Sequence, residues 1–204
     1  CMAYLSLVTP PTGEPLALVE LKQHLKIEPE QVDEDALLQR YARSAAAYIE
    51  GKTGRQLLTA TWLYALDAFP SSGWLELPRA PLRTITSLTY RDAGGSSQAW
   101  AASNYIVDAP AGLTAPRGRV SLASSVTWPV LQGSASDVLV RFTAGYGTAA
   151  DLPDDLVTAM LLLCGHWYSN REAALVGSIS KEFEFSVTAL IGRYISRSTQ
   201  VVAA

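Results

Sequence analysis

The feature that most constrains the fold is an almost uninterrupted apolar stretch over residues 156–168. Pro153 precedes it, at a position where the first turn of a helix tolerates a missing N–H. Asp154 and Asp155 then place negative charge where the helix dipole favours it. These residues predict one helix over 153–172, roughly 30 Å long. A bilayer requires about 20 apolar residues, so we expect a core helix and no membrane span.

Two shorter helices are predicted before it, over residues 17–26 and 33–52, because both carry apolar side chains at helical spacing. The second is expected to end at Gly51 and Gly54, since glycine commonly terminates helices. Residues 2–16 contain three prolines and are interpreted as an extended arm. Near the C-terminus, a loop over 177–184 and a short helix over 186–195 are expected.

Gly165 interrupts the long apolar helix, at a cost of roughly 1 kcal/mol relative to alanine. We interpret it as the place where another backbone crosses closely. Tyr48 and Ile49, on the apolar face of the second helix, are the expected partners at this crossing. Neither helical segment can bury its apolar stripe alone, so the N- and C-terminal helices are expected to pack on each other.

Between the helical segments the apolar period changes from helical to alternating. Six short segments rich in β-branched and aromatic residues are separated by turn signals, at 58–66, 74–77, 83–91, 104–108, 119–123 and 137–145. The predicted fold class is α+β: a small helical bundle with an inserted antiparallel β-sandwich or barrel-like domain. We expect residues 1–56 to supply the arm and first helices, 57–147 the β-domain, and 148–204 the remaining helices and tail.

Composition and charge argue against several functions. The formal net charge is −3 and the pI is about 5.4, and no third of the chain is strongly basic, so nucleic-acid binding is not expected. Only two cysteines are present, which implies no disulfide framework and suits a reducing cytoplasm. Cys1 precedes Met2 and could be a remnant of cloning, and no basic segment followed by an apolar run indicates a signal peptide.

Catalytic and metal-binding patterns are largely missing. His24 and His166 are isolated in sequence, and Cys164 and His166 lie two positions apart on a helix, so their side chains point apart. No nucleophile or phosphate-loop motif occurs in a fitting context, and no cofactor is expected. Scattered acids could hold a glycosidase pair, but exposed acids are usually only solvated: Asp67, Glu76, Asp92, Asp108 and Asp137. Tryptophans of the β-region could stack on sugars or bases, but are more often core: Trp62, Trp74, Trp100 and Trp128.

Several stretches taken together resemble one known family. They are LVTPPTGEPLALVELKQHLKIE (7–28), TGRQLLTATW (53–62), LELPRAPLRTITSLTY (75–90), NYIVD (104–108), VRFTAGYG (140–147) and LPDDLVTAMLLLCGHWYSNREA (152–173). Each is weak alone, but their order and spacing are similar to the head-tail connector (adaptor) proteins of tailed bacteriophages, in the long form with an inserted β-domain. The resemblance covers about residues 7–195. It departs at Ala17, where relatives carry a serine that caps the first helix.

The resemblance implies a non-enzymatic structural protein of the virion, assembled in the host cytoplasm. It would form a ring of twelve copies that binds the portal protein on one side and tail or stopper proteins on the other. DNA would pass through the lumen without specific binding. The implied subunit contacts are Trp167, Tyr168, Arg171 and Glu172, and the implied portal contacts are Arg193, Tyr194 and Arg197. Ordinary helix-end packing or solvation explains each of these residues equally well.

Other functions remain open at this point. The chain could be another ring protein of the phage tail, such as a tail-completion or tail-terminator protein, or a β-sandwich binding module. A carbohydrate hydrolase that uses the tryptophan-rich β-domain is the least favoured, because no paired catalytic constellation is present.

Overall fold

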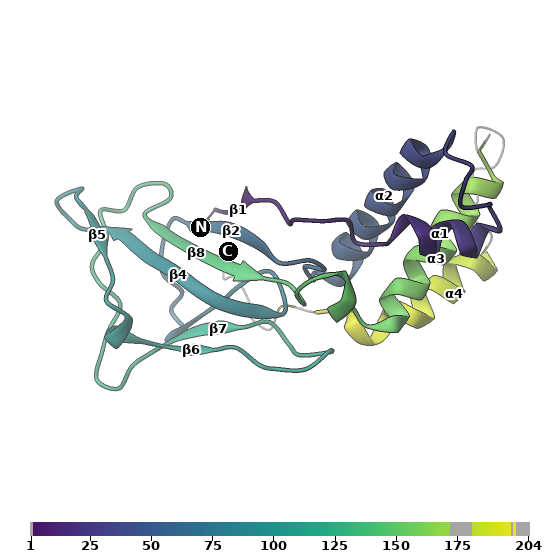
Figure 1. The fold of residues 1–204 in the computed structure, drawn as a ribbon. Coiled ribbons are helices and arrows are strands. Elements are labelled where there is room, and N and C mark those ends of the chain that lie inside the picture. Colours follow the sequence, from purple (N-terminus) through teal and green to yellow (C-terminus); the bar gives the residue numbers. More distant parts are fainter. Residues whose placement is uncertain (1, 172–180, 197, 199–204) are drawn as a thin grey trace. The chain divides into compact units, whose positions relative to one another are not determined.

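A computed structural model describes residues 2–171, 181–196 and 198 (Figure 1). The chain divides into two compact units. Of the described residues, a sheet unit comprises 2–11, Thr59–Gly145, Ser196 and Ser198. A helical unit comprises Thr12–Leu58 and Tyr146–Ile195. The strand-rich segment is thus inserted in sequence between two helical segments that belong together.

The described residues of the helical unit form four α-helices: α1 (Leu18–Leu25), α2 (Asp35–Thr53), α3 (Asp154–Ser169) and α4 (Lys181–Ile191). Two short 3₁₀ turns, Ala149–Asp151 and Gly192–Tyr194, flank α3 and α4. All four helices contribute to one apolar core, in which side chains of α2 such as Leu38 and Ile49 pack with Leu156 and Met160 of α3. The predicted α+β fold, with N- and C-terminal helices packed together, is therefore confirmed.

Local sequence explains where these helices begin and end. Helix α2 ends at Gly54, whose φ of 69° lies in the left-handed region that glycine adopts at little cost. Helix α3 begins at Asp154 directly after Pro153, with both predicted aspartates in its first turn. Its buried side chains follow helical spacing: Leu156, Ala159, Met160, Leu163 and Cys164. Burial raises the pKa of the Cys164 thiol to about 12.

A buried arginine ties two distant parts of the helical unit together. Arg55 is 1% exposed, and its Nε donates a hydrogen bond of 2.6 Å to the carbonyl oxygen of Tyr194. Its guanidinium also lies about 6 Å from the ring centroids of Tyr146 and Tyr194. Arg55 therefore joins the end of α2 to the turn that follows α4.

The sheet unit contains two antiparallel sheets. The larger sheet has the order β1-β2-β8-β4-β5, formed by Ala3–Thr9, Ala60–Leu66, Val138–Ala144, Leu82–Arg91 and Ser97–Ala99. The smaller sheet has the order β3-β7-β6, formed by Trp74–Glu76, Arg119–Leu122 and Tyr105–Asp108. A 3₁₀ turn at Ala102–Asn104 leads into β6.

The core of the sheet unit follows the alternation expected of half-buried strands. Along β8, the side chains of Val138, Val140 and Phe142 are fully buried, and the residues between them are more exposed. They share one apolar cluster with Leu88 of β4 and with Leu75 and Val120 of the smaller sheet. One core therefore lies between the two sheets, as in a sandwich.

The structure differs from the predicted elements in three places. The prediction of an unpacked N-terminal arm is wrong, because Ala3–Thr9 forms β1 and pairs with β2 from Ala3↔Leu66 onward. The prolines that suggested an arm follow the strand and leave its ladder intact. Strand β5 was not predicted. Helix α4 begins at Lys181 and ends at Ile191, so its first turn occupies part of the expected loop.

The predicted crossing at Gly165 also differs from the structure. A Cβ added to Gly165 would lie 3.3 Å from Nε2 of His24 and 3.8 Å from Cδ2 of Leu25. The atoms nearest to this position are therefore side-chain atoms at the end of α1. Ile49 is fully buried in the shared core and Tyr48 packs partly against it, so both contribute to the packing of α2.

Candidate functional site

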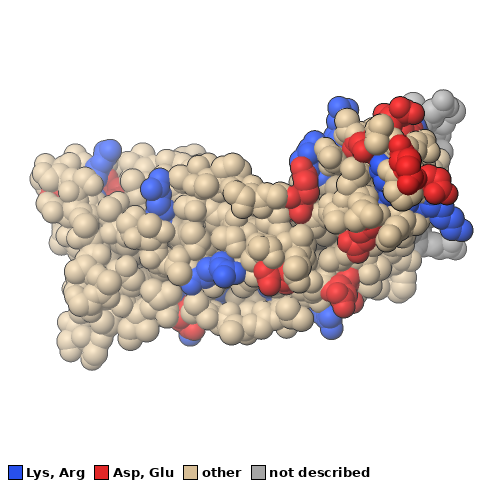
Figure 2. Space-filling model, viewed as in Figure 1, with Lys and Arg blue, Asp and Glu red and all other residues tan. Residues whose placement is uncertain are grey.

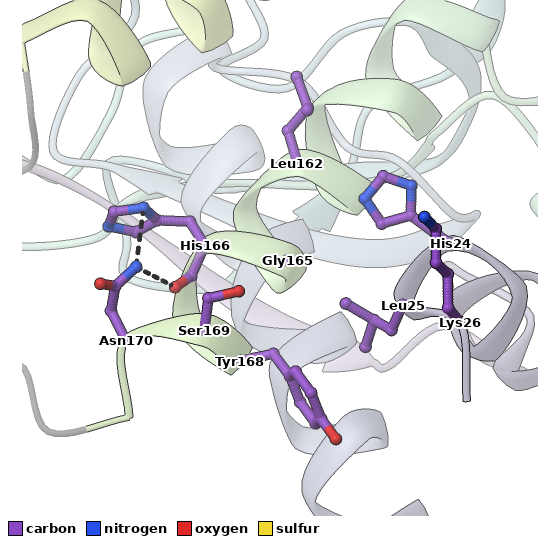
Figure 3. A pocket seen from close by; sticks show the side chains of 9 residues that line it. All are labelled: His24, Leu25, Lys26, Leu162, Gly165, His166, Tyr168, Ser169 and Asn170. Carbon is purple, nitrogen blue, oxygen red and sulfur yellow. Dashed lines mark hydrogen bonds between the residues drawn. The ribbon is translucent and has the colours of Figure 1, made fainter.

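A pocket of about 530 Å³ lies in the helical unit, between the end of α1 and the second half of α3 (Figure 3). Its walls combine apolar, aromatic and polar side chains: His24, Leu25, Lys26, Leu162, Gly165, His166, Tyr168, Ser169 and Asn170. The missing side chain of Gly165 leaves the space between the two helices open. This pocket adjoins the end of α3, where the resemblance predicts subunit contacts.

The two histidines lie on either side of the Gly165 turn of α3 (Figure 3). The carbonyl oxygen of His166 accepts a hydrogen bond of 2.9 Å from Nδ2 of Asn170. Across the described part of the chain, no three His, Cys, Asp or Glu side chains gather in a way that could hold a metal ion.

An ion pair next to the pocket joins the end of α3 to the start of α2. The guanidinium of Arg171 donates to Glu34 at 2.9 Å, and the Tyr168 hydroxyl donates to the same carboxylate at 2.6 Å. Arg171 also lies over the Tyr168 ring, 4.2 Å from its centroid. Two of the four predicted subunit-contact residues are thus held together by a third residue of their own chain.

The loop before α2 places Glu34 for this interaction. Lys22 of α1 is buried and forms an ion pair of 2.6 Å with Asp35. Its ammonium group also donates to the carbonyl oxygens of Pro29 and Gln31 at 3.1 and 2.8 Å. These contacts fix the α1–α2 loop and hence the backbone at Glu34.

Hydrogen bonding shifts the proton affinities in this cluster. The hydrogen bond from Arg171, followed by that from Tyr168, lowers the pKa of the Glu34 carboxyl below its ordinary value. The hydrogen bond from the Tyr168 hydroxyl to the Glu34 carboxylate stabilises the protonated phenol, which raises the pKa of Tyr168. Glu34 is therefore ionised and Tyr168 neutral throughout the physiological pH range.

Helix α3 leaves part of its apolar surface only half-buried. Leu161 and Leu162 pack only partly against the core, and Trp167 lies 6.1 Å from Tyr41, ring centroid to centroid. Tyr168 is also half-buried. An apolar helix face that the described residues cover only in part is typical of a protein contact surface.

The remaining predicted contact residues have different surroundings. The guanidinium of Arg193 forms an ion pair with Asp155 and donates to the Tyr194 hydroxyl at 2.7 Å, while its side chain stays 61% exposed. Tyr194 is fully buried, which does not fit its predicted role as a portal contact. Its hydroxyl points to Asp155 within the helical unit. Glu172 and Arg197 lie outside the described residues.

The acids and tryptophans of the sheet unit have structural surroundings. Asp67, Asp92 and Asp137 accept hydrogen bonds from backbone N–H groups of turns. Glu76 pairs with Arg117 and Asp108 with Arg119. Trp100 and Trp128 belong to the core with Phe69, and Trp62 and Trp74 face the guanidinium groups of Arg79 and Arg119. Asp67 and Asp137 interact electrostatically, and both accept backbone hydrogen bonds from the same turn, which gives them a structural role.

Charged side chains of both signs are interspersed over the helical unit, whereas few appear on the sheet unit, on the face that Figure 2 shows. No strongly basic patch is visible there. Among the described helices, none combines the length and the apolar character needed to cross a membrane.

Comparison with known proteins identifies the family. A family model of phage gp6-like head-tail connector proteins matches residues 16–95. A chain in the neck of an empty gene transfer agent (GTA) particle, computed with C6 symmetry, superposes with a TM-score of 0.78 at 30% identity, over 97% of both chains. The chain belongs to the head-tail connector family. A chain in the neck of a native GTA particle, computed with C12 symmetry, matches this connector with a TM-score of 0.76, 30% identity and 97% coverage of both chains.

A chain from the virion of the native gene transfer agent gives a TM-score of 0.76 at 30% identity, over 96% of this connector and 97% of that chain. No curated protein matches the sequence. The family predicted from the sequence is thus confirmed, and with it a structural role in joining head and tail. Glu34 and the pocket were missed, because no sequence signal connects Glu34 with Tyr168, 134 positions later.

Proposed function

We propose that this connector assembles into a ring at the junction of a DNA-filled head and a tail, in a phage or phage-like particle. It binds the portal protein on one side and tail or stopper proteins on the other, and it has no enzymatic role. The observation that carries the proposal is the match over 97% of both chains to neck proteins of GTA particles, whose necks were computed with C6 and C12 symmetry. A ring of twelve copies satisfies both symmetries.

The pocket face of α3 is proposed as a subunit contact. Leu162 and Tyr168 line the pocket, and Trp167 and Arg171 lie within three positions of Tyr168. Aromatic and arginine side chains are enriched in protein interfaces, and the half-buried apolar surface of α3 would gain burial there. The Glu34–Arg171 ion pair holds the edge of this surface in a fixed geometry.

Arg193 is proposed as a contact to the portal. Its side chain is exposed although Asp155 and Tyr194 fix its guanidinium. Such a side chain loses little conformational entropy when a partner carboxylate or carbonyl binds to it. Glu172, and Arg197 close to Arg193 in sequence, remain candidates for the subunit and portal contacts, respectively.

DNA is proposed to pass the ring without specific contacts. The chain carries a net charge of −3, so the wall of a ring built from it would not grip phosphates. Binding through phosphates depends on lysine and arginine, and it would retard DNA movement.

The proposal is tested by mixing the purified connector with the portal protein of the same particle. Native mass spectrometry should show a complex heavier than the portal by about 260 kDa, from twelve copies of the 21.9 kDa chain. A portal whose mass is unchanged over the accessible concentration range would contradict the proposal.

Two lysine substitutions test the subunit contact in the same experiment. Leu162→Lys places a charge in the pocket and should reduce the number of bound copies, whereas Ala47→Lys, at an exposed position of α2, should bind as wild type. Circular dichroism should show equal helix content in both variants. Full binding by a folded Leu162→Lys variant would exclude the pocket as a contact.

A further inference from the structure

Among the described residues, two strands of the sheet unit each have an edge that no other strand pairs with. Strand β1 lies at the end of the five-stranded sheet and pairs with β2 alone, and β6 lies at the end of the smaller sheet and pairs with β7 alone. Within the described part of the chain, neither has a second partner strand. Each therefore presents main-chain N–H and C=O groups that can pair with another chain.

Both edges carry exposed apolar side chains. On β1, Tyr4 is 54% and Leu7 is 47% exposed, and on β6, Ile106 is 59% and Val107 is 40% exposed. Residues 1–13 contain no charged side chain, and the one acid of β6, Asp108, is paired with Arg119 of β7. The two edges thus resemble each other in apolar character and in the absence of free charge.

Proteins usually protect edge strands by shortness, lysine, proline or a bulge. The other two edges of this unit fit that rule, since β5 is a polar strand of three residues and β3 is equally short and contains Glu76. Strand β1 has a bulge only between Leu7 and Thr9, so its first five residues form a regular, unprotected edge. An apolar edge left open in one copy indicates that the assembly covers it.

Cyclic symmetry restricts what can cover these edges. Pairing β1 with β1 of another copy creates a two-fold contact, which closes after two subunits and cannot propagate around a ring. A ring requires contact between two different surfaces of adjacent copies. Strand β6, with four residues, is the other edge of the same unit that carries exposed apolar side chains.

We propose that β1 of one copy pairs with β6 of the next, which joins the sheet units of adjacent copies through main-chain hydrogen bonds. The inference rests on the proposed ring and adds a contact separate from the pocket of the helical unit. The occupant of each edge is thus a second copy of this chain. Backbone pairing would supply affinity, and the apolar side chains of both edges would be buried together.

Disulfide trapping tests this contact. In the full chain with Cys1→Ser, a β1 cysteine (Tyr4→Cys or Leu7→Cys) is combined with a β6 cysteine (Ile106→Cys or Val107→Cys). Side chains an odd number of positions apart on a strand point to opposite faces, so the four double variants sample both faces of each strand. Buried Cys164 does not compete. After mild oxidation of the concentrated protein with the portal, at least one double variant should give a ladder of trimers and larger species. Single variants should stop at dimers.

The matched control replaces the β6 cysteine by Val130→Cys, at an exposed loop position of the same unit. A ladder of equal yield from this control, or no ladder from any of the four variants, would overturn the edge pairing. If the portal gains about 260 kDa while no ladder forms, the pairing fails and the proposed ring stands. If the portal gains no mass, the proposed function fails whatever the ladder shows.

Leu7→Lys provides a second measurement without cysteine chemistry. Lysine on an edge strand disfavours pairing, so this variant should bind the portal with at least tenfold weaker apparent affinity, whereas Val130→Lys should bind as wild type. Unchanged binding of a folded Leu7→Lys variant would count against the pairing.

Discussion

At the scale of single residues, the end of α3 is fixed by polar contacts, whereas its middle is fixed by apolar packing. The carboxylate of Glu34 accepts hydrogen bonds from both Tyr168 and Arg171, and these residues belong to two helices far apart in sequence. Both partners favour the ionised form of Glu34, which lowers its pKa. The geometry of the proposed contact surface therefore depends on the charge of one carboxyl group.

Glu34→Gln should change how stability depends on pH. Because the pKa of Glu34 is lower in the folded state, its contribution is complete above the ordinary value of 4.5 and is lost as pH falls through the lowered value. The variant should be less stable than wild type at pH 7, and the difference should shrink below about pH 4.5. Urea midpoints measured from pH 7 to pH 3 check this.

Tyr168→Phe is the matched comparison, because it removes one hydrogen bond to Glu34 and keeps the ion pair with Arg171. It should retain most of the pH dependence of wild type. A stability difference between Glu34→Gln and wild type that is constant over the whole pH range would contradict this account.

Arg55→Met tests the buried contact between the end of α2 and Tyr194. The variant leaves the Tyr194 carbonyl without the 2.6 Å hydrogen bond and should lower the free energy of unfolding by about 1–3 kcal/mol. Arg43→Met removes only an exposed ion pair with Glu14 and should stay within about 0.5 kcal/mol of wild type. Urea unfolding followed by circular dichroism at 222 nm reports on the helices. Equal midpoints for both variants would refute the role of Arg55.

At the scale of elements, the approach of α1 to α3 depends on Gly165. The position of its absent side chain lies 3.3 Å from His24, closer than an ordinary van der Waals contact. The nearest atoms belong to side chains, which can move. Gly165 also lines the pocket between α1 and α3.

Gly165→Leu should therefore force α1 away from α3 and lower the free energy of unfolding by about 1–3 kcal/mol, as overpacked sites do. Gly165→Ala should be close to neutral, because a gain in helix propensity of about 1 kcal/mol offsets the tight contact with His24. Thermal unfolding of both variants provides the measurement. A Gly165→Leu variant as stable as wild type would show that the two helices do not pack closely here.

The helices and strands that the sequence predicts well are those in which a regular spacing of apolar residues extends over many positions. Helices α2 and α3 and the alternating strand β8 are found close to their predicted positions. Strand β1 was missed because its partner β2 lies about sixty residues further along the chain, and its local signal was outweighed by Pro10 and Pro11. The start of α4 was missed because residues 182–185, EFEF, alternate charge and phenylalanine and show no helical spacing.

The candidate site was predictable only in part. The apolar and aromatic end of α3 pointed to a surface of interest, and Tyr168 and Leu162 do line a pocket. The residues that contact the end of α3 come from α1 and from the loop before α2, and only folding brings them next to α3. Burial of Tyr194 was equally hidden, because it depends on Arg55 and Asp155 from distant segments.

At the scale of the whole molecule, the connector combines a helical unit whose α3 is half-covered with a sheet unit that has two open edges. Both features are unusual for a protein that works as a monomer. They are expected of a subunit whose surface is completed by its neighbours. The net charge of −3 fits the proposal that DNA passes the ring without specific contacts.

The connector should therefore not bind duplex DNA at physiological salt. Few phosphates can be neutralised by a chain with 16 basic and 19 acidic side chains. Fluorescence anisotropy with a labelled duplex should show no binding at micromolar protein. Submicromolar binding would contradict a lumen that does not bind DNA, provided that the affinity falls steeply with salt. For phosphate contacts, the logarithm of the binding constant falls by close to one unit per tenfold increase in salt for each phosphate contacted.

The position of the connector in the particle tests the central claim most directly. Particles assembled with a tagged connector can be labelled with gold-conjugated antibody and imaged by cryo-electron microscopy. We predict label only at the junction of head and tail, and, in the averaged neck, a ring of cyclic symmetry into which the two units fit. Label on the capsid shell or at the tail tip, or a neck without this ring, would contradict the account.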